Sequence, residues 1–171
     1  FNGNQHLIFN SYKQCILKSA IIDSESSNTI TFELRDNAGL VIDDTSLTVI
    51  AGTQQVNLNF NVPVGNDLQL GVSNNSLQTN GLYRNNTGAN YPYDIGSAIS
   101  ITKSSANTNP YDYYYFFYNI EVEIKCISAP NSWDCDNQGN CFDPGTGNGQ
   151  YNSLSSCEAE CVNVSINETE L

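Results

Sequence analysis

The chain has 171 residues, enough for one domain with an apolar core and a smaller unit beside it. Its 18 acidic and 6 basic side chains give a formal net charge of -12, which repels phosphate backbones and argues against a nucleic-acid partner. No apolar run approaches the roughly 20 residues that span a bilayer, so we expect no membrane insertion.

Six cysteines are present and methionine is absent. Four of these cysteines fall between Cys135 and Cys161, a density that fits disulfides formed outside the cytosol. The sequence therefore predicts a secreted, extracellular protein, attached to a cell surface or belonging to a larger exported protein.

Alternation of apolar and polar side chains predicts strands through most of the chain. Side chains of a strand point to opposite faces in turn, whereas a helix needs apolar spacings of three and four. A bend or bulge is expected at residues 43–46, within the second of the longer strands. The turns between strands are rich in Gly, Asn, Asp and Pro. We predict strands at residues 6–9, 15–17, 29–35, 40–50, 56–62, 68–72, 99–102 and 111–126.

The strand predicted at residues 111–126 is the longest. Its even positions are predicted to be buried, which places Cys126 in the interior, where by elimination it pairs with Cys15. Tyr113, Tyr115 and Phe117 then form an outward stripe, which is either covered by a second layer or exposed as a binding patch.

About eight antiparallel strands with termini brought together predict an all-β fold, a β-sandwich over residues 1–126. A jelly roll is the first choice and an immunoglobulin-like sandwich the second, because strand order cannot be read from one sequence.

A compact cysteine-rich segment is predicted at residues 133–161, after a linker at 127–132 and before a polar tail at 162–171. So short a segment cannot bury an adequate core, so disulfides must substitute for one. A short helix over 153–161 would place two cysteines one turn apart, which favours their pairing with the two earlier cysteines over pairing with each other. Zinc is the competing interpretation. The four cysteines are Cys135, Cys141, Cys157 and Cys161.

Several runs share a pattern: TFELRD (31–36), QVNLNF (55–60), LQLG (68–71), GLYRNN (81–86), YPY (91–93) and YYYFFY (113–118). Together they resemble a β-sandwich module of large exported proteins of Bacteroidetes bacteria. The resemblance implies a module that accompanies enzymes, adhesins or repeat domains and precedes a sorting domain of the type IX secretion system. Residues 133–161 are similar to a short Cys-rich repeat of exported proteins, and residues 167–171 to the linker before such a sorting domain.

Catalytic chemistry finds little support in the sequence. His6 is the only histidine, and neither a serine triad nor a cysteine dyad can be assembled around it. Glu121 and Glu123 are a carboxylate pair, but beside Lys125 they are typical of a solvated sheet face. We therefore expect no enzyme.

The loop at residues 81–94 is the candidate binding site. Its tyrosines offer flat apolar faces to sugar rings, and its polar side chains offer hydrogen bonds at their edges. In the alternative interpretation the same tyrosines fold down as a lid over the core. The candidate ligand-binding residues are Tyr83, Arg84, Asn85, Asn86, Tyr91, Tyr93 and Asp94.

Calcium is the candidate cofactor, because carboxylate and amide oxygens in turns suit a hard cation. A complete ligand loop is missing, and ordinary turn chemistry is the competing interpretation. The candidate ligands are Asp36 with Asn37, Asp43 with Asp44, and Asp67 with Asn66.

These features predict a non-catalytic binding module, carbohydrate-binding or adhesive, whose partner is a polysaccharide or a cell-surface glycan. The alternative is a structural spacer between neighbouring domains of a larger exported protein.

Overall fold

The computed structural model describes residues 5–74, 81–124 and 130–161. The chain forms two compact units, Phe1–Lys125 and Cys126–Leu171. We call the first the sandwich unit and the second the cysteine-rich unit. Half of the linker predicted at residues 127–132 and all of the tail predicted at 162–171 lie outside the described residues.

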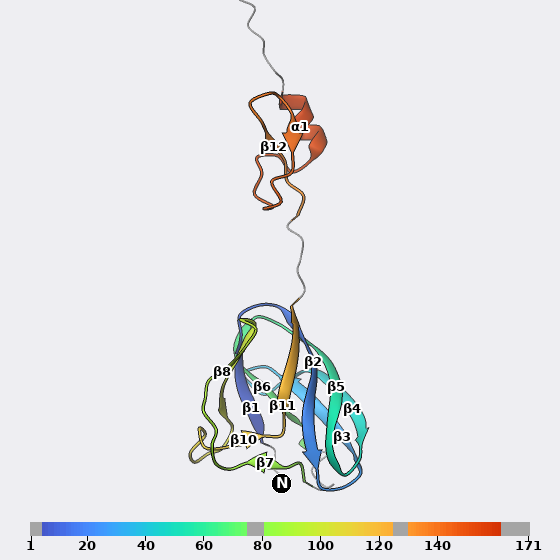
Figure 1. Cartoon of the computed structure of the whole chain (residues 1–171), viewed down its shortest axis with the longest axis vertical. Coiled ribbons are helices and arrows are strands. Elements are labelled where there is room, and N and C mark those ends of the chain that lie inside the picture. Colours follow the sequence, from blue (N-terminus) through green and yellow to red (C-terminus); the bar gives the residue numbers. More distant parts are fainter. Residues whose placement is uncertain (1–4, 75–80, 125–129, 162–171) are drawn as a thin grey trace, which may run out of the picture. The chain divides into compact units, whose positions relative to one another are not determined.

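Two antiparallel sheets form the sandwich unit, as predicted (Figure 1). The six-stranded sheet consists, in spatial order, of β4 (Val41–Val49), β3 (Asn28–Arg35), β6 (Gly65–Val72), β1 (His6–Ser11), β9 (Ile99–Ser104) and β8 (Tyr93–Ile95). The three-stranded sheet consists of β11 (Tyr118–Ile124), β2 (Cys15–Ser24) and β5 (Gly52–Val62). A short ladder joins β7 (Arg84–Asn85) to β10 (Tyr114–Tyr115).

The first six strands pair as one long hairpin rolled across both sheets. The turn at residues 36–40 joins β3 to β4, and outside this pair β2 pairs with β5 and β1 with β6. Such nesting around a single turn is the pattern of a jelly roll, the predicted architecture. β9 then extends the six-stranded sheet beside β1, and β11 extends the other sheet beside β2.

The alternation read from the sequence matches the interior in β3, β5 and β6. Every second side chain of β5 is buried, from Val56 to Val62, and the asparagines between them are exposed. Ile30, Phe32 and Leu34 of β3 lie in the same core. The hydrophobic contacts between the two sheets therefore follow from period-two burial.

The bend predicted at residues 43–46 is wrong, because β4 runs without interruption through this segment. The irregularity lies earlier, where Leu34 pairs with Asp43 but Arg35 pairs with Val41. One extra residue on β4 at this point makes a bulge beside the turn, so the strand beyond it is regular.

The single long strand predicted at residues 111–126 is also wrong. Phe116 has a φ of 66°, and the chain changes there from β10 to β11. A bulky residue at positive φ interrupts the alternation of faces. Tyr115, Phe116 and Phe117 are consequently buried in succession, so the outward stripe predicted through Tyr115 and Phe117 is covered.

The predicted bridge between Cys15 and Cys126 is not formed. Cys15 is a free, buried thiol on β2, and burial raises the pKa of this thiol. Cys126 lies outside the described residues. The pairing of Cys15 with Cys126 was predicted because the other four cysteines lie in the C-terminal segment. That argument fails because a free cysteine can pack in an interior as a small apolar side chain, without a disulfide partner.

Arg35 of β3 is a buried charged residue that lies beside Glu33. The side chains are 7% and 13% exposed, and Arg35 Nε donates to Glu33 Oε2 at 2.7 Å. Arg35 Nη2 also donates to the carbonyl oxygen of Val72 at 2.6 Å. Gly71 leaves room for the guanidinium: a Cβ at this position would lie 3.3 Å from Arg35 Nη1 and 2.9 Å from the Cβ of His6.

The Gly71→Ala variant is expected to lose about 1–3 kcal/mol of unfolding free energy. The added methyl group would meet the Cβ of His6, which is attached directly to the strand backbone and cannot move aside. Urea unfolding followed by circular dichroism measures the loss. Gly65→Ala, on the same strand, is the control, since its Cβ would meet Leu68 at an ordinary 3.5 Å. Equal stability of the two variants would contradict the crowding at Gly71.

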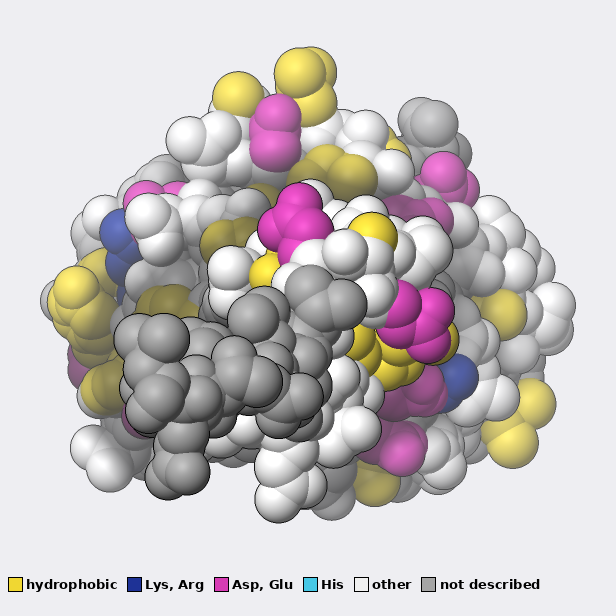
Figure 2. Space-filling view, turned by 90° about the horizontal axis from the view of Figure 1, so that it is seen from above, with side chains coloured by type: hydrophobic (Ala, Val, Ile, Leu, Met, Phe, Trp, Pro, Cys, Tyr) yellow, Lys and Arg dark blue, Asp and Glu magenta, His cyan; other side chains and the backbone are white. Residues whose placement is uncertain are grey.

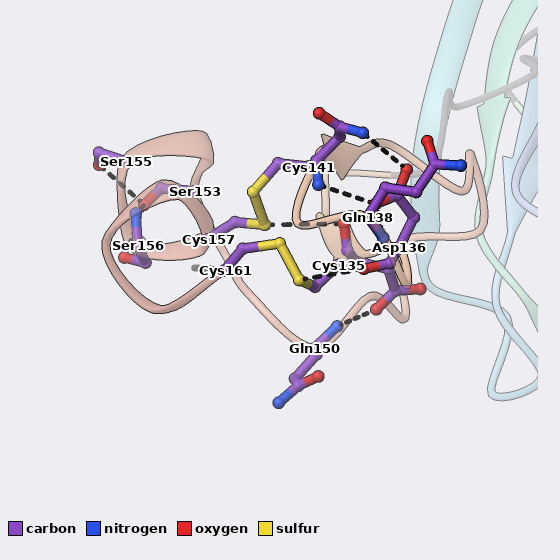
Figure 3. Close-up of a disulfide and its surroundings, with 12 residues drawn as sticks. Cys135, Asp136, Gln138, Cys141, Gln150, Ser153, Ser155, Ser156, Cys157 and Cys161 are labelled. Carbon is purple, nitrogen blue, oxygen red and sulfur yellow. Dashed lines mark hydrogen bonds between the residues drawn. A yellow bond between two sulfur atoms is a disulfide. The ribbon is translucent and has the colours of Figure 1, made fainter. Parts of the chain in front are cut away.

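The cysteine-rich unit is built around two disulfides. It contains β12 (Asp134–Cys135), β13 (Cys141–Phe142) and α1 (Leu154–Glu160), and the Oγ of Ser153 caps the helix by accepting from the backbone N–H of Ser156. The bridges are Cys135–Cys161 and Cys141–Cys157, so the predicted pairing between helix and earlier cysteines is confirmed. Figure 3 shows the two bridges side by side. Bridged sulfurs offer no thiolate to zinc.

A tight turn joins the two strands of this unit (Figure 3). The Oδ1 of Asp136 accepts from the backbone N–H groups of Asn140 and Gln138, both at 2.8 Å. The hydrogen bond from the Asn140 backbone contributes most to lowering the pKa of this carboxyl. The turn therefore holds Cys135 opposite Cys141, its partner in the strand register.

None of the helices among residues 5–74, 81–124 and 130–161 has the length and apolar character that a membrane crossing requires.

Candidate functional site

Aromatic rings gather where β8, β10 and β11 meet. The ring of Tyr114 lies 6.0 Å from that of Tyr91, 5.3 Å from that of Tyr93 and 5.5 Å from that of Tyr118, measured between centroids. We call these four residues the tyrosine cluster. Such spacing is within the favourable range for aromatic pairs, so the cluster braces the β8 edge of one sheet against β11 of the other.

Tyr91 is held inside this cluster. Its hydroxyl donates to the backbone oxygen of Tyr113 at 2.7 Å, and its ring packs against the core. Burial raises the pKa of both Tyr91 and Tyr114 well above the ordinary tyrosine value. The lid interpretation thus describes Tyr91 better than exposure to a ligand does.

Arg84 is engaged with two aromatic rings. Its guanidinium carbon lies 4.5 Å from the ring centroid of Tyr113 and 5.5 Å from that of Tyr115. It also donates from Nη1 to the Tyr115 hydroxyl at 3.1 Å. These cation–π contacts fix the 81–86 loop against β10.

A hollow of about 370 Å³ opens between β8 and β11, the neighbouring edges of the two sheets. We call it the edge hollow. Its walls combine aromatic rings with carboxylate and amide groups, the combination that the sequence predicted for a sugar site. Its lining residues are Asn85, Tyr93, Asp94, Ile95, Ile101, Tyr114, Tyr118, Asn119 and Ile120.

A second hollow, of about 340 Å³, lies beside the first over the outer face of the three-stranded sheet. We call it the face hollow. Tyr83 stands at this hollow with 51% of its surface exposed. The lining residues are Ile21, Asp23, Thr53, Tyr83, Arg84, Asn85, Tyr118 and Asn119.

A bulge at the start of β11 places residues at both hollows. Tyr118 pairs with Ile21 and Glu121 with Ser19, so β11 has one residue more than β2 between these pairs. Asn119, at a φ of 44°, occupies this bulge. Bulges redirect side chains and are frequent beside binding sites, which fits the shared position of Tyr118 and Asn119.

The Tyr118 side chain connects the bulge to the 81–86 loop. Its hydroxyl donates to Asn85 Oδ1 at 3.4 Å, a long hydrogen bond at the rim. Burial raises the pKa of Tyr118, and the nearby carboxylate of Asp23 raises it further. The hydroxyl therefore stays protonated at neutral pH, and while it donates to Asn85 its oxygen can accept a hydrogen bond from a ligand hydroxyl.

Three of the predicted ligand-binding residues, Asn85, Tyr93 and Asp94, meet at the edge hollow, and Tyr83, Arg84 and Asn85 meet at the face hollow. The exposed Asn86 lines neither.

Sequence reasoning missed Tyr118, Asn119 and Asp23. Parity had assigned Tyr118 to the interior, and the signal that was available is Asn119, since asparagine tolerates the positive φ of a bulge.

Two of the candidate calcium ligands, Asp36 and Asp43, accept hydrogen bonds from the backbone. Asp36 Oδ1 accepts from the N–H groups of Ala38 and Leu40, both at 2.9 Å, and Asp43 Oδ2 accepts from Asn61 N–H at 3.1 Å. Within the described part of the chain, these acidic residues do not gather in threes as a metal site would require. Calcium at Asp36, Asn37, Asp43, Asp44 and Asp67 stays a prediction.

The other acidic pair considered, Glu121 and Glu123, makes contacts across the sheet surface. Glu121 Oε2 accepts from Ser19 Oγ at 2.9 Å, and Glu123 Oε2 lies 3.6 Å from Lys18 Nζ. Both contacts join β11 to β2 and are typical of a sheet exterior.

The chain has 18 acidic and 6 basic side chains. Figure 2 shows one face, on which magenta acidic groups are scattered and dark blue basic groups are few.

Comparison of the chain with protein-family models, curated proteins and solved structures finds no match.

Proposed function

We propose that the sandwich unit is a non-catalytic carbohydrate-binding module of an exported protein, with a polysaccharide or cell-surface glycan as its partner. The observation that carries the proposal is the edge hollow. It offers the rings of Tyr93, Tyr114 and Tyr118 beside the polar groups of Asp94 and Asn119. A sugar ring needs an apolar platform and hydrogen-bond partners at its edge, and both are present.

Export is supported by the two disulfides of the cysteine-rich unit, which persist in oxidising compartments. Surface attachment and a place in a larger, type IX-secreted protein follow from the resemblance described above and belong to the same proposal.

Tyr118→Ala is expected to weaken polysaccharide binding at least roughly tenfold, because the variant removes a ring at the centre of the site. Retention on insoluble polysaccharides and affinity electrophoresis in gels with soluble ones measure the loss. Tyr118→Phe keeps the ring and is expected to retain most of the affinity. Tyr12→Ala is the matched control, since Tyr12 is 55% exposed and lines neither hollow.

Unchanged retention of Tyr118→Ala would place binding elsewhere on the molecule. A panel of polysaccharides that the wild-type protein ignores would instead favour a structural spacer. The separation of the chain into two compact units is what supports that second candidate.

A further inference from the structure

The two hollows share a wall. Asn85, Tyr118 and Asn119 line both of them, with the edge hollow on one side and the face hollow on the other. A molecule that fills one hollow therefore contacts the same three residues as a molecule that fills the other. A chain-like ligand that crosses this wall would occupy both hollows at once.

Each hollow has its own aromatic side chain and its own carboxylate. The edge hollow has Tyr93 and Asp94, and the face hollow has Tyr83 and Asp23. Tyr93 is fixed, since its hydroxyl accepts from the backbone N–H of Asn90 at 2.7 Å and its ring contacts Tyr91. The same pair of functional groups thus occurs twice, as a ligand with a repeating unit requires.

The carboxylate at the edge hollow and the net charge of the chain disfavour anionic ligands. Asp94 is the charged residue at the edge hollow. The face hollow has one carboxylate, Asp23, and one guanidinium, Arg84, which keeps its charge while it lies over the Tyr113 ring and donates to the Tyr115 hydroxyl. Carboxylates accept hydrogen bonds from sugar hydroxyls and repel carboxylate or sulfate groups, and the net charge of -12 adds to the repulsion.

We infer that the two hollows are consecutive subsites for a linear, uncharged glycan, with at least one sugar ring on each side of the wall formed by Asn85, Tyr118 and Asn119. This inference rests on the proposed carbohydrate-binding function and adds ligand length and charge to it. The wall residues contact the glycan between the two rings.

Isothermal titration with defined oligosaccharides tests the inference on the full chain. The uncharged probes are oligomers of one to six units of glucose, mannose, xylose or N-acetylglucosamine, and the anionic probes are oligomers of galacturonate and mannuronate. For the uncharged series that binds, the affinity is expected to rise at least roughly tenfold from the single sugar to the tetrasaccharide, because the second subsite adds contacts. The anionic hexamers are expected to bind at least roughly tenfold more weakly than the uncharged hexamers of that series.

Variants on the two sides of the wall separate the subsites. Tyr83→Ala and Tyr93→Ala are each expected to weaken tetrasaccharide binding about tenfold, whereas Tyr12→Ala leaves it unchanged. Asp94→Asn is expected to reduce the difference in affinity between uncharged and anionic hexamers, because the variant removes the carboxylate that repels the anions.

The outcomes of these experiments distinguish a failure of the two-subsite inference from a failure of the proposed carbohydrate-binding function. Affinity that is independent of length, with Tyr83→Ala harmless, would leave a carbohydrate-binding module with one subsite and overturn the two-subsite inference. Tighter binding of the uronates would overturn the charge selectivity alone. A response to none of the probes by the wild-type protein would overturn both the inference and the proposed function.

Discussion

Replacing Cys141 and Cys157 together by serine is expected to unfold the cysteine-rich unit and leave the sandwich unit folded. Within the described part of this unit, the buried side chains are Ser132, Cys157 and Cys161, so apolar packing cannot hold it together. In the chain-entropy model, the Cys141–Cys157 bridge, with a sequence separation of 16, contributes about 3 kcal/mol. That is most of what so small a unit can have.

Tryptophan fluorescence measures this effect selectively, because Trp133 is the only tryptophan of the chain and lies in the cysteine-rich unit. The emission of the double serine variant is expected to shift to that of an exposed indole, and dithiothreitol should produce the same shift in the wild-type protein. Cys15→Ala is the control and should leave the emission unchanged, since Cys15 is a free thiol of the sandwich unit. Native emission after full reduction would contradict the structural role of the bridges.

The Arg35→Ala variant is expected to lose about 3–5 kcal/mol of unfolding free energy. Removing the guanidinium leaves the carboxylate of Glu33, only 13% exposed, without its cation, and leaves the carbonyl of Val72 without the hydrogen bond from Nη2. An uncompensated buried charge costs far more than the intact ion pair contributes. Chemical unfolding at neutral pH, followed by far-ultraviolet circular dichroism, measures the loss.

The double variant Arg35→Leu with Glu33→Leu is the control for this loss. It removes both charges and fills the space with apolar atoms, so its stability is expected to lie close to that of the wild-type protein. If the single and double variants are equally unstable, packing around Arg35 matters and the ion pair does not.

The sequence predicts best those strands that have one buried face and one solvent-exposed face. In β5 the asparagines at positions 57, 59 and 61 mark that face, and hydrophobic burial decides the other. Phe116 shows where this reasoning stops, because a positive φ at phenylalanine has no signature in composition and is imposed by the surrounding packing. This one residue interrupts the alternation of faces in the aromatic run, so Tyr115 and Phe117 are buried together with Phe116.

The sequence predicted only part of the candidate site, because part of that site depends on backbone irregularities that composition does not show. Asn85, Tyr93 and Asp94 stand in a polar loop, where side chains suited to sugars are visible in the sequence. Tyr118 and Asn119 come from a strand in which a bulge, a product of the register with β2, turns them toward the hollows. Register depends on tertiary pairing, so a pattern read along one strand does not contain it.

From the rolled hairpin of β1 to β6 we also expect an order of folding. Closing the turn at residues 36–40 first shortens the loops that the two outer pairs must close, so the sheets can zip outward from one nucleus. β11 has no place in that hairpin and leaves the ribosome after all six of its strands. From this order we expect Tyr118 and Asn119 to reach their positions late, so that the two proposed glycan subsites are completed only after the scaffold that supports them has formed.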